Sequence, residues 1–435
     1  MPNMPSDTPR TDTLSVLEAP FWEYGNGALR QHAAIVATLD GSPSADEIAS
    51  RFAGRLDWCG RLTSVIVDRG GQFRRPYFSD DPNFDFDNHF HCVQVPGDGT
   101  LEGFSRFFSA EFHKPFDATR PQWDVWYAPG IDGGSMIALR AHHAMLDGLS
   151  GIEWFRAVSD QSISLDDAQH GVRTSHARAL EERRRPEPDA AGTDTANSGP
   201  LGSALEILGS RPEPLWPQQV GPERLLTWGS LSMPAVKQIR AATSTSTAAV
   251  VQTMMSYALE TLAADLPGDV TVSMPMSVRH LFQALYPLDL SSRQISSPLG
   301  LTTVEKAPLA RLAEMQRRVS AVKLSRKNFL RAAELARMAP RKLLLAAAKQ
   351  KMARSNFISA PCAGPREQFT IGDTKITDIA LHTGMVPNNP MSMGATAYLD
   401  NLSVGITADP TIVPRADELP KAMAEALKRI LAEVG

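Results

Sequence analysis

The residues with the clearest capacity for chemistry lie in one segment, SMIALRAHHAMLDGLS, at positions 135–150. Two adjacent histidines, His142 and His143, are followed by an acid at Asp147 and a glycine at Gly148. Imidazole has an ordinary pKa close to neutral pH, so a positioned histidine can remove a proton from a hydroxyl, an amine or a thiol. The segment therefore favours a general base held in a compact polar turn.

Only one of the two histidines is expected to be that base. Successive side chains of a strand point to opposite faces, so His142 and His143 face apart. His143 stands at the end of a predicted strand, where its side chain can enter a cleft, and His142 is then structural. Asp147 directly precedes a predicted helix, where a carboxylate can cap the helix or hold an ion-pair partner. Gly148 permits close approach of a ligand, and its N–H is a candidate donor to a developing oxyanion.

Two other interpretations of the segment are weaker. It could be an ordinary strand–loop–helix junction with an aspartate cap and two incidental histidines. The pair of histidines, the Asp-Gly step and the preceding PFDATRPQW segment together favour chemistry instead. A metal site is disfavoured because HHAMLD lacks the His-x-x-x-His spacing of a helical site and its two histidines face apart. We therefore expect no metal here.

Turn signals and periodicity indicate the elements that position the motif. Residues 123–128 and 135–142 are predicted strands, and the intervening PGIDGG sequence is strong turn chemistry. After Gly148, apolar residues recur at helical spacing at Leu149, Ile152 and Phe155. The motif is therefore expected where a hairpin meets a helix.

The length of 435 residues predicts two domains of about 200 residues each. Residues 1–13 are polar and expected to be disordered. A first domain is expected over 14–160 and a second over 221–435, because both stretches alternate strand and helix patterns. Residues 161–220 are polar and proline-bearing, which predicts a linker that is partly disordered. The sequence therefore indicates two α/β domains.

Bulk composition narrows the classes of protein. The net charge of −4 gives no case for nucleic-acid binding. The three cysteines lie far apart without CxxC spacing, which argues against a disulfide framework or a zinc site and favours a reducing, cytoplasmic setting. No run of about 18 apolar residues exists, so no membrane-spanning helix is expected.

Residues 323–354 form the one strongly biased stretch, with ten basic residues against a single acid, Glu334. Leucines and Phe329 are interleaved with the charges, and Pro340 interrupts the stretch. A basic amphipathic helix can lie on an anionic membrane surface or meet the phosphates of coenzyme A. The alternative is a solvated helix face, and the pattern leaves both open.

A family resemblance rests on several segments. HHAMLDG matches the HHxxxDG motif, and PFDATRPQWDVWYAPGIDGG leads into it. FDFDNHFHCVQVP, the MPMSVR segment ending at Arg279, and Ser355-Asn356-Phe-Ile-Ser-Ala-Pro add to the pattern. Together they resemble the bacterial wax ester synthase/diacylglycerol acyltransferase family of the HHxxxDG superfamily, over nearly the whole chain.

The resemblance implies a fold of two chloramphenicol-acetyltransferase-like, mixed-sheet domains with a tunnel between them. It implies acyl transfer from acyl-CoA, as a co-substrate with no bound cofactor, to the hydroxyl of an alcohol or diacylglycerol. His143 becomes the base, while His142 and Asp147 hold the motif and Arg279 is the candidate partner of Asp147. Direct transfer without an acyl-enzyme is expected, because no cysteine is near the motif in sequence. Ser355 and Asn356 are candidates for substrate-binding or structural roles, and a peripheral place at the inner membrane face or a lipid droplet is possible.

The chain departs from the family pattern mainly in its second half. Ser292-Arg293 replaces a Gly-Asn pair, Ala248-Ala249 replaces an Asn-Asp helix start, and Gln122 replaces a leucine in the first half. The second half lines the acceptor side in this fold. Two further hypotheses therefore stand beside the first: an acyltransferase that uses a carrier-protein thioester or a natural-product acceptor, and a non-catalytic binding protein.

Overall fold

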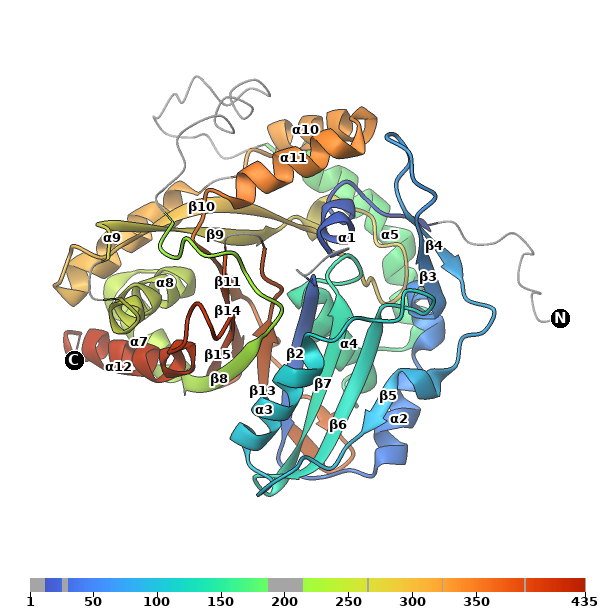
Figure 1. Cartoon of the computed structure of the whole chain (residues 1–435), viewed down its shortest axis with the longest axis horizontal. Coiled ribbons are helices and arrows are strands. Elements are labelled where there is room, and N and C mark those ends of the chain that lie inside the picture. Colours follow the sequence, from blue (N-terminus) through green and yellow to red (C-terminus); the bar gives the residue numbers. More distant parts are fainter. Residues whose placement is uncertain are drawn as a thin grey trace.

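The computed structural model describes residues 12–25, 30–186, 214–263, 266–322, 324–386 and 389–434. Two six-stranded mixed sheets, each accompanied by helices, form its two halves (Figure 1). A small three-stranded antiparallel sheet joins the first half, and its strands are β1 (Asp12–Thr13), β3 (Ser64–Val67) and β4 (Tyr77–Asp80). The predicted α/β class is confirmed.

The first sheet carries the motif on its central strands. Its order is β12-β13-β2-β7-β6-β5. The strands in that order are Thr370–Ile371, Thr374–His382, His32–Leu39, Gly134–His142, Trp123–Ile131 and Phe90–Cys92. Every residue of β7 is buried, and β6 and β7 form the predicted hairpin. Helices α2 (Ala45–Ala53) and α4 (Gly148–Val158) pack on one face, and α3 (Leu101–Phe112) packs on the other.

The second sheet has the order β10-β9-β11-β14-β15-β8. These strands are Gln294–Thr302, Asp269–Ser277, Phe357–Cys362, Met391–Tyr398, Asn401–Ala408 and Leu225–Ser232. Four helices pack with it: α7 (Met233–Thr243), α8 (Thr247–Ala258), α9 (Pro308–Ala321) and α12 (Leu419–Ala432). Helix α8 is apolar on nearly all sides because it lies among the other three, and residues 249–258 are all buried.

Strand β13 corrects the predicted domain boundaries. It belongs to the second half in sequence, yet it pairs antiparallel with β2 of the first sheet, with Leu381 opposite Ile35. Its end also packs against β14 and β15 of the second sheet. Cβ atoms added at Gly394 and Gly405 would lie 2.6 and 2.3 Å from the Leu381 carbonyl oxygen, so only glycine permits this approach. The second predicted domain, 221–435, therefore contributes strands to the first.

The predicted linker, 161–220, is only partly a linker. Helix α5 spans Leu165–Arg184, and the Ser164 hydroxyl caps it by accepting a hydrogen bond from the Asp167 N–H. Its polarity hid it from sequence reasoning, because only Ala168 and Ala179 are buried. Residues 187–213 lie outside the described residues, as do 1–11 of the segment predicted to be disordered. Asp12 and Thr13, which belong to that predicted segment, pair with β4.

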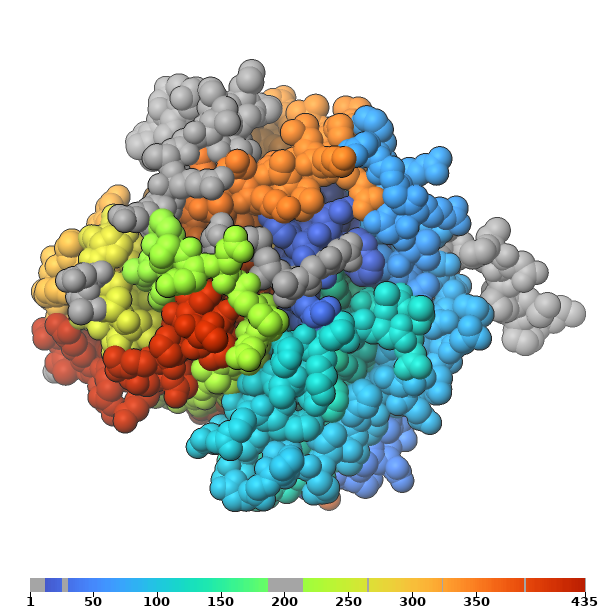
Figure 2. Space-filling model, in the orientation of Figure 1, coloured from blue at the N-terminus to red at the C-terminus, as the bar shows by residue number. Residues whose placement is uncertain are grey.

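Three helices border the space between the halves: α1 (Ala19–Gly25), α10 (Arg326–Met338) and α11 (Arg341–Met352). We call α10 and α11 the roof helices. In Figure 2 they lie in orange beside dark-blue α1 and against the lighter blue loop between β3 and β4. None of the roof-helix residues is buried. Across the described ranges, no helix is both long and apolar enough to cross a bilayer.

One arginine joins the roof helices to the first half. Arg341 pairs with Glu23 of α1 and with Asp68 of the loop between β3 and β4; its Nη2 lies 2.7 Å from Asp68 Oδ2. The Arg341 N–H also donates to the Gln72 carbonyl at 2.7 Å. The start of α11 is therefore fixed to the first half although its sequence belongs to the second.

Candidate active site

The HHAMLDG segment bridges the end of β7 and the start of α4. His142 is the last residue of β7, and Gly148 is the first of α4. The His143 N–H donates to the Gln31 carbonyl at 2.6 Å, and the Met145 N–H donates to the His142 carbonyl at 2.8 Å. These bonds close the polar turn that the sequence predicts.

The His143 ring is fixed on three sides. It stacks on Phe21 of α1 with ring centres 4.3 Å apart. Its Nε2 lies 3.3 Å from the Gln294 side-chain amide nitrogen, which can only donate, so Nε2 carries the lone pair. Its Nδ1 lies 3.4 Å from the Ser292 hydroxyl. With the Gln294 amide in this orientation, the neutral ring carries its proton on Nδ1.

Burial lowers the pKa of His143, and nearby carbonyls and the Asp147 carboxylate act in the opposite direction. The ring is therefore neutral at neutral pH, and the Gln294 amide lies against its Nε2 at 3.3 Å. A base of this kind must be unprotonated before it acts. His143 thus has both the protonation state and the orientation of a general base.

His142 has a different environment. Its ring packs against Trp22, 5.3 Å away between centres, and against His32, and its Nδ1 accepts the Ala144 N–H at 3.1 Å. Burial, with a smaller contribution from the charge of His143, lowers the pKa of His142 to about 3. The cavity beside His143 does not include His142 in its lining. The geometry agrees with the structural role predicted for it.

Asp147 is bound from several directions. Its carboxylate accepts bonds from Arg279 Nη2 at 3.0 Å on both oxygens, from the Arg293 N–H at 2.9 Å and from the Ser150 N–H at 2.9 Å. The Ser150 hydroxyl accepts the Asp147 N–H, which completes a capping box on α4. Burial raises the pKa of Asp147, but Arg279 and the two N–H donors outweigh it and lower the pKa below its ordinary value. Asp147 is therefore an ionised anchor rather than a proton carrier.

Arg279 is itself held in place. Its Nη1 lies 3.1 Å from Asp289 Oδ2, and its Nη2 donates to the Ser291 carbonyl. The pair between Arg279 and Asp147 joins the second half of the chain to the motif across 132 residues. The predicted partner of Asp147 is the observed one.

Gly148 lies close to side chains of the second half. A Cβ at this position would lie 3.0 Å from Leu381 Cδ1 and 3.9 Å from Cys362 Sγ. Both Gly148 and Leu149 line the cavity beside His143. The first amides of a helix have no intrahelical acceptor, so the N-terminus of α4 presents free N–H donors close to the base.

A cavity of about 460 Å³ lies beside His143, where the family resemblance implies a tunnel between the two halves. Its wall is mostly apolar and comes from α1, the motif, the ends of β9, β10, β11 and β13, and α11. Tyr24 and Thr383 are in this wall, and neither hydroxyl has a hydrogen-bond partner in the described part of the chain. The cavity therefore suits an apolar ligand that carries a few acceptor groups.

Ser355 and Asn356 lie outside this wall. The Asn356 Oδ1 accepts the Leu215 N–H at 2.6 Å, and the Ser355 hydroxyl donates to the Met352 carbonyl at 3.0 Å. Both bonds fix backbone segments to the second sheet. Of the two roles predicted for this pair, the geometry supports the structural one, because their polar atoms are used within the protein.

Residues 14–338 match the family model of the wax ester synthase/diacylglycerol acyltransferase catalytic domain, and residues 295–431 match that of the C-terminal domain. The chain belongs to this family. It is therefore an acyltransferase. A Mycobacterium tuberculosis protein named probable diacylglycerol O-acyltransferase is 22% identical over 91% of this chain and 90% of its own length. An Acinetobacter baylyi protein named O-acyltransferase WSD is 22% identical over 81% of this chain and 82% of its own length.

Solved structures show the same fold. The wax ester synthase/diacylglycerol acyltransferase of Marinobacter aquaeolei VT8 covers 97% of this chain and 100% of its own, with a TM-score of 0.68 at 16% identity. The first condensation domain of the calcium-dependent antibiotic synthetase covers 97% of both chains, with a TM-score of 0.63 at 16% identity. The predicted two-domain fold of the family is confirmed.

Sequence reasoning missed four residues around the base: Phe21, Gln31, Ser292 and Gln294. Ser292 and Gln294 come from the second half, about 150 positions from His143. The one available signal was the departure of Ser292-Arg293 from the family pattern. The two substituted residues contact the motif directly: Ser292 lies against His143, and the Arg293 N–H donates to Asp147.

Cys362 is a second correction. It is remote from the motif in sequence, but it lines the cavity beside Gly148. Burial raises the pKa of its thiol to about 12. The thiol stays protonated at neutral pH and is a weak nucleophile, since the thiolate is the reactive form.

Proposed function

We propose that this acyltransferase moves a fatty acyl group from acyl-CoA to the hydroxyl of an alcohol or diacylglycerol, with His143 as general base. The observation that carries the proposal is the buried, neutral imidazole of His143 in the wall of a mostly apolar cavity. An apolar cavity suits an acyl chain and a lipid acceptor.

In the proposed reaction, His143 Nε2 accepts the proton of the acceptor hydroxyl while its oxygen attacks the thioester carbonyl. The Gly148 N–H, at the start of α4, is placed to donate to the oxyanion that forms. The intermediate collapses by breaking the C–S bond. The imidazolium then returns its proton to the leaving thiolate, so the ester and free thiol leave with the base restored.

We propose that transfer is direct, without an acyl-enzyme. Cys362 is the cysteine that lines the cavity, and its raised pKa keeps it protonated. Asp147, already bonded to Arg279, holds the motif and does not exchange protons. His143 therefore acts on the acceptor itself rather than on a protein nucleophile.

The two hydroxyls without partners favour an acceptor with carbonyl oxygens. Tyr24 and Thr383 line the cavity, and a buried hydroxyl without a hydrogen bond costs stability. The ester carbonyls of diacylglycerol could accept from both, whereas a simple long-chain alcohol has no such acceptors. Diacylglycerol is accordingly our preferred acceptor.

The test is to incubate the protein with labelled palmitoyl-CoA and either hexadecanol or diacylglycerol, alongside His143→Ala. Ester formed by the wild type and lost in the variant supports the proposal. Activity only with an acyl carrier protein as donor would contradict the acyl-CoA proposal. Ligand binding without turnover on either donor would instead support a non-catalytic binding protein.

We also propose that the roof helices meet an anionic lipid surface. Met338 and Leu343 are 70% and 60% exposed, and Phe73, 73% exposed, follows Gln72, whose carbonyl bonds Arg341. Lys342 adjoins this apolar patch. Exposed apolar side chains among cations are the pattern of an interfacial helix.

Co-sedimentation with phosphatidylglycerol vesicles at low salt tests this surface, with phosphatidylcholine vesicles for comparison. Met338→Asp with Leu343→Asp should reduce binding about tenfold, because each change places a charge where apolar area would be buried. Val304→Asp is the matched control, since Val304 is equally exposed at 69% but lies away from the roof. Equal binding by the control and the double variant would contradict the proposal.

A further inference from the structure

A second cavity, of about 440 Å³, lies next to the one that holds His143. The two share the side chains of Val16 and Leu17 in their walls. We call it the arginine pocket. Its walls come from the segment before α1, from α5, from the stretch around Phe282 and from α10, with Arg61, Arg75 and Arg293 added from elsewhere in the chain.

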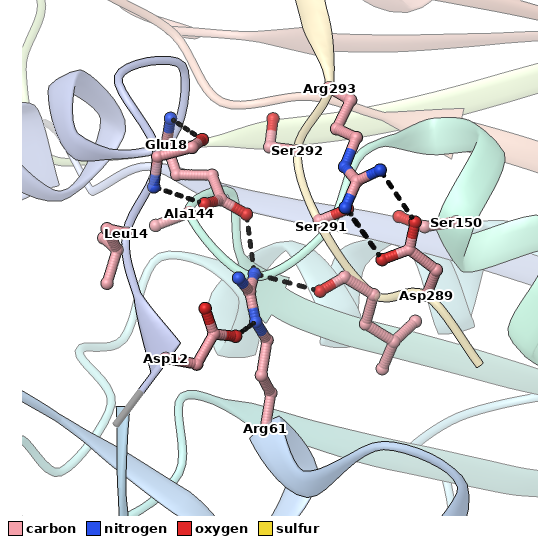
Figure 3. Close-up of polar contacts among 12 residues, drawn as sticks. Asp12, Leu14, Glu18, Arg61, Ala144, Ser150, Asp289, Ser291, Ser292 and Arg293 are labelled. Atoms are coloured by element: carbon pink, nitrogen blue, oxygen red, sulfur yellow. Dashed lines mark hydrogen bonds and ion pairs between the residues drawn. The ribbon is translucent and has the colours of Figure 1, made fainter. Parts of the chain in front are cut away.

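Two of the five arginines in this wall are neutralised within the protein. Figure 3 shows Arg61 between Asp12 and Glu18, at 2.6 Å from each carboxylate, and Arg293 against Asp289. Arg61 also donates to the Leu290 carbonyl at 3.1 Å, which ties the segment before α1 to the second half. The charges of Arg61 and Arg293 are therefore balanced by carboxylates that stabilise the wall shared with the catalytic cavity.

The other three guanidinium groups, of Arg75, Arg183 and Arg337, have no carboxylate partner in the described ranges. Arg75 donates to the Leu14 carbonyl at 2.9 Å, and Arg183 donates to the Leu281 carbonyl at 2.9 Å. Glu334 also lines the pocket but forms no ion pair there within the described residues. Burial and the nearby charge of Arg337 lower the pKa of Arg75. Positive charges that repel one another beside a cavity favour an anionic ligand.

The rest of the wall is apolar. Phe282 lies beneath the guanidinium groups of Arg183 and Arg293, at 5.9 and 5.5 Å from its ring centre. Leu180, Leu285 and Leu330 complete the apolar side. An aromatic ring beside arginines can stack against a planar nucleotide base. Guanidinium groups that have no carboxylate partner can donate hydrogen bonds to phosphates.

We infer that the arginine pocket binds the phosphate-bearing nucleotide of the acyl-CoA donor. The inference rests on the proposed function, which names acyl-CoA as the donor. The shared wall at Val16 and Leu17 marks the short route by which the pantetheine arm would reach His143. The pocket is walled by side chains from several separate segments, which suits a small ligand better than the flat docking face of a carrier protein.

Calorimetric titration of the full chain with adenosine 3′,5′-bisphosphate tests the site without any turnover. We expect saturable binding, weakened at least tenfold in the Arg75→Gln/Arg337→Gln variant, because two charge-assisted phosphate contacts are removed. Arg331→Gln is the matched control: it changes an arginine of α10 that does not line the pocket. No binding by the wild type, or equal binding by all three proteins, would overturn the inference.

Kinetics separate this inference from the proposed function. The double variant should raise the KM for palmitoyl-CoA about tenfold with kcat changed less than twofold, since the pocket is remote from the reacting atoms. The KM for palmitoyl-pantetheine, which lacks the nucleotide, should not change. An equal rise for both donors would overturn the inference. If the protein binds the nucleotide but transfers no acyl group from any donor, the proposed function is contradicted, while the arginine pocket is still shown to bind the nucleotide.

Discussion

The motif turn and α11 of the roof helices border the same cavity, but the turn and the roof helices are held in opposite ways. In the motif turn, the carboxylate of Asp147 accepts hydrogen bonds from Arg279, Arg293 and Ser150, and Asp147 is almost fully buried. The roof helices have no buried residue and are attached through ion pairs of Arg341 with Glu23 and Asp68 and of Arg326 with Glu182. Regions with few buried contacts open at lower free energy than densely bonded ones. The comparison indicates that the base is fixed on a densely bonded turn, whereas the roof helices open locally at lower free energy.

The strongest test of the rigid side is removal of the base. His143→Ala should lower kcat about 10³-fold, because general base catalysis contributes about 10² to 10⁴ in rate. Steady-state kinetics with palmitoyl-CoA and diacylglycerol measure the loss, and an unchanged unfolding midpoint shows that the fold is kept. Residual activity within tenfold of wild type would remove His143 from the mechanism.

The second test breaks the anchor of the turn. Arg279→Met should lower the free energy of unfolding by about 2 kcal/mol, since it leaves the buried Asp147 carboxylate without its cation. Urea unfolding measures this change. Asp147→Asn in the same background should recover part of the loss, because the uncompensated charge is then gone. Additive losses in the double variant would show that the two side chains do not stabilise one another.

The third test measures stability against pH. The buried histidines with lowered pKa values lie in or near the motif turn, so a change of pH acts on that region. Burial lowers the pKa of His32 well below its ordinary value and that of His142 to about 3, whereas the roof helices contain no histidine. Below about pH 6.5 the unfolded chain binds protons that these folded histidines do not, so stability falls as pH falls. Each contributes up to about 1.4 kcal/mol per pH unit between its unfolded and folded pKa values.

Urea unfolding between pH 7.5 and 5.5 measures that slope. His32→Gln should make this slope shallower, because one of the two buried histidines with a lowered pKa is then gone. A slope that does not change with His32 would mean that this ring is protonated in the folded protein.

The smallest expected effect is on the movable side. Arg341→Ala removes the ion pairs to Glu23 and Asp68, which are partly exposed, so the loss of global stability should be about 1 kcal/mol or less. Limited proteolysis within 324–352 should nevertheless accelerate several-fold, because the roof opens locally. Arg331→Ala on α10 serves as control. Equal proteolysis of both variants would show that Arg341 does not hold the roof.

Sequence reasoning predicted best what is local. The hairpin, the helix after Gly148, the division of labour between His142 and His143, and the partner of Asp147 follow from strand alternation, turn chemistry and a family motif. Ser292 and Gln294 could not be found this way, because their contacts with His143 depend on how the two sheets meet. Helix α5 was missed because a helix with two buried alanines has almost no apolar stripe. The arginine pocket was equally hidden, since its walls come from several segments far apart in the sequence.

Strand β13 has a consequence for how the protein forms. It completes the first sheet from positions 374–382, far beyond the strands at 32–39 and 134–142 that it joins. During synthesis, β2 therefore remains an unpaired sheet edge until most of the chain has emerged from the ribosome. Such an edge invites association with other chains, and domains otherwise tend to fold as they are made. The strand that unites the two halves thus makes the first half dependent on the last part of the chain, so a fragment ending at the linker should be prone to aggregation.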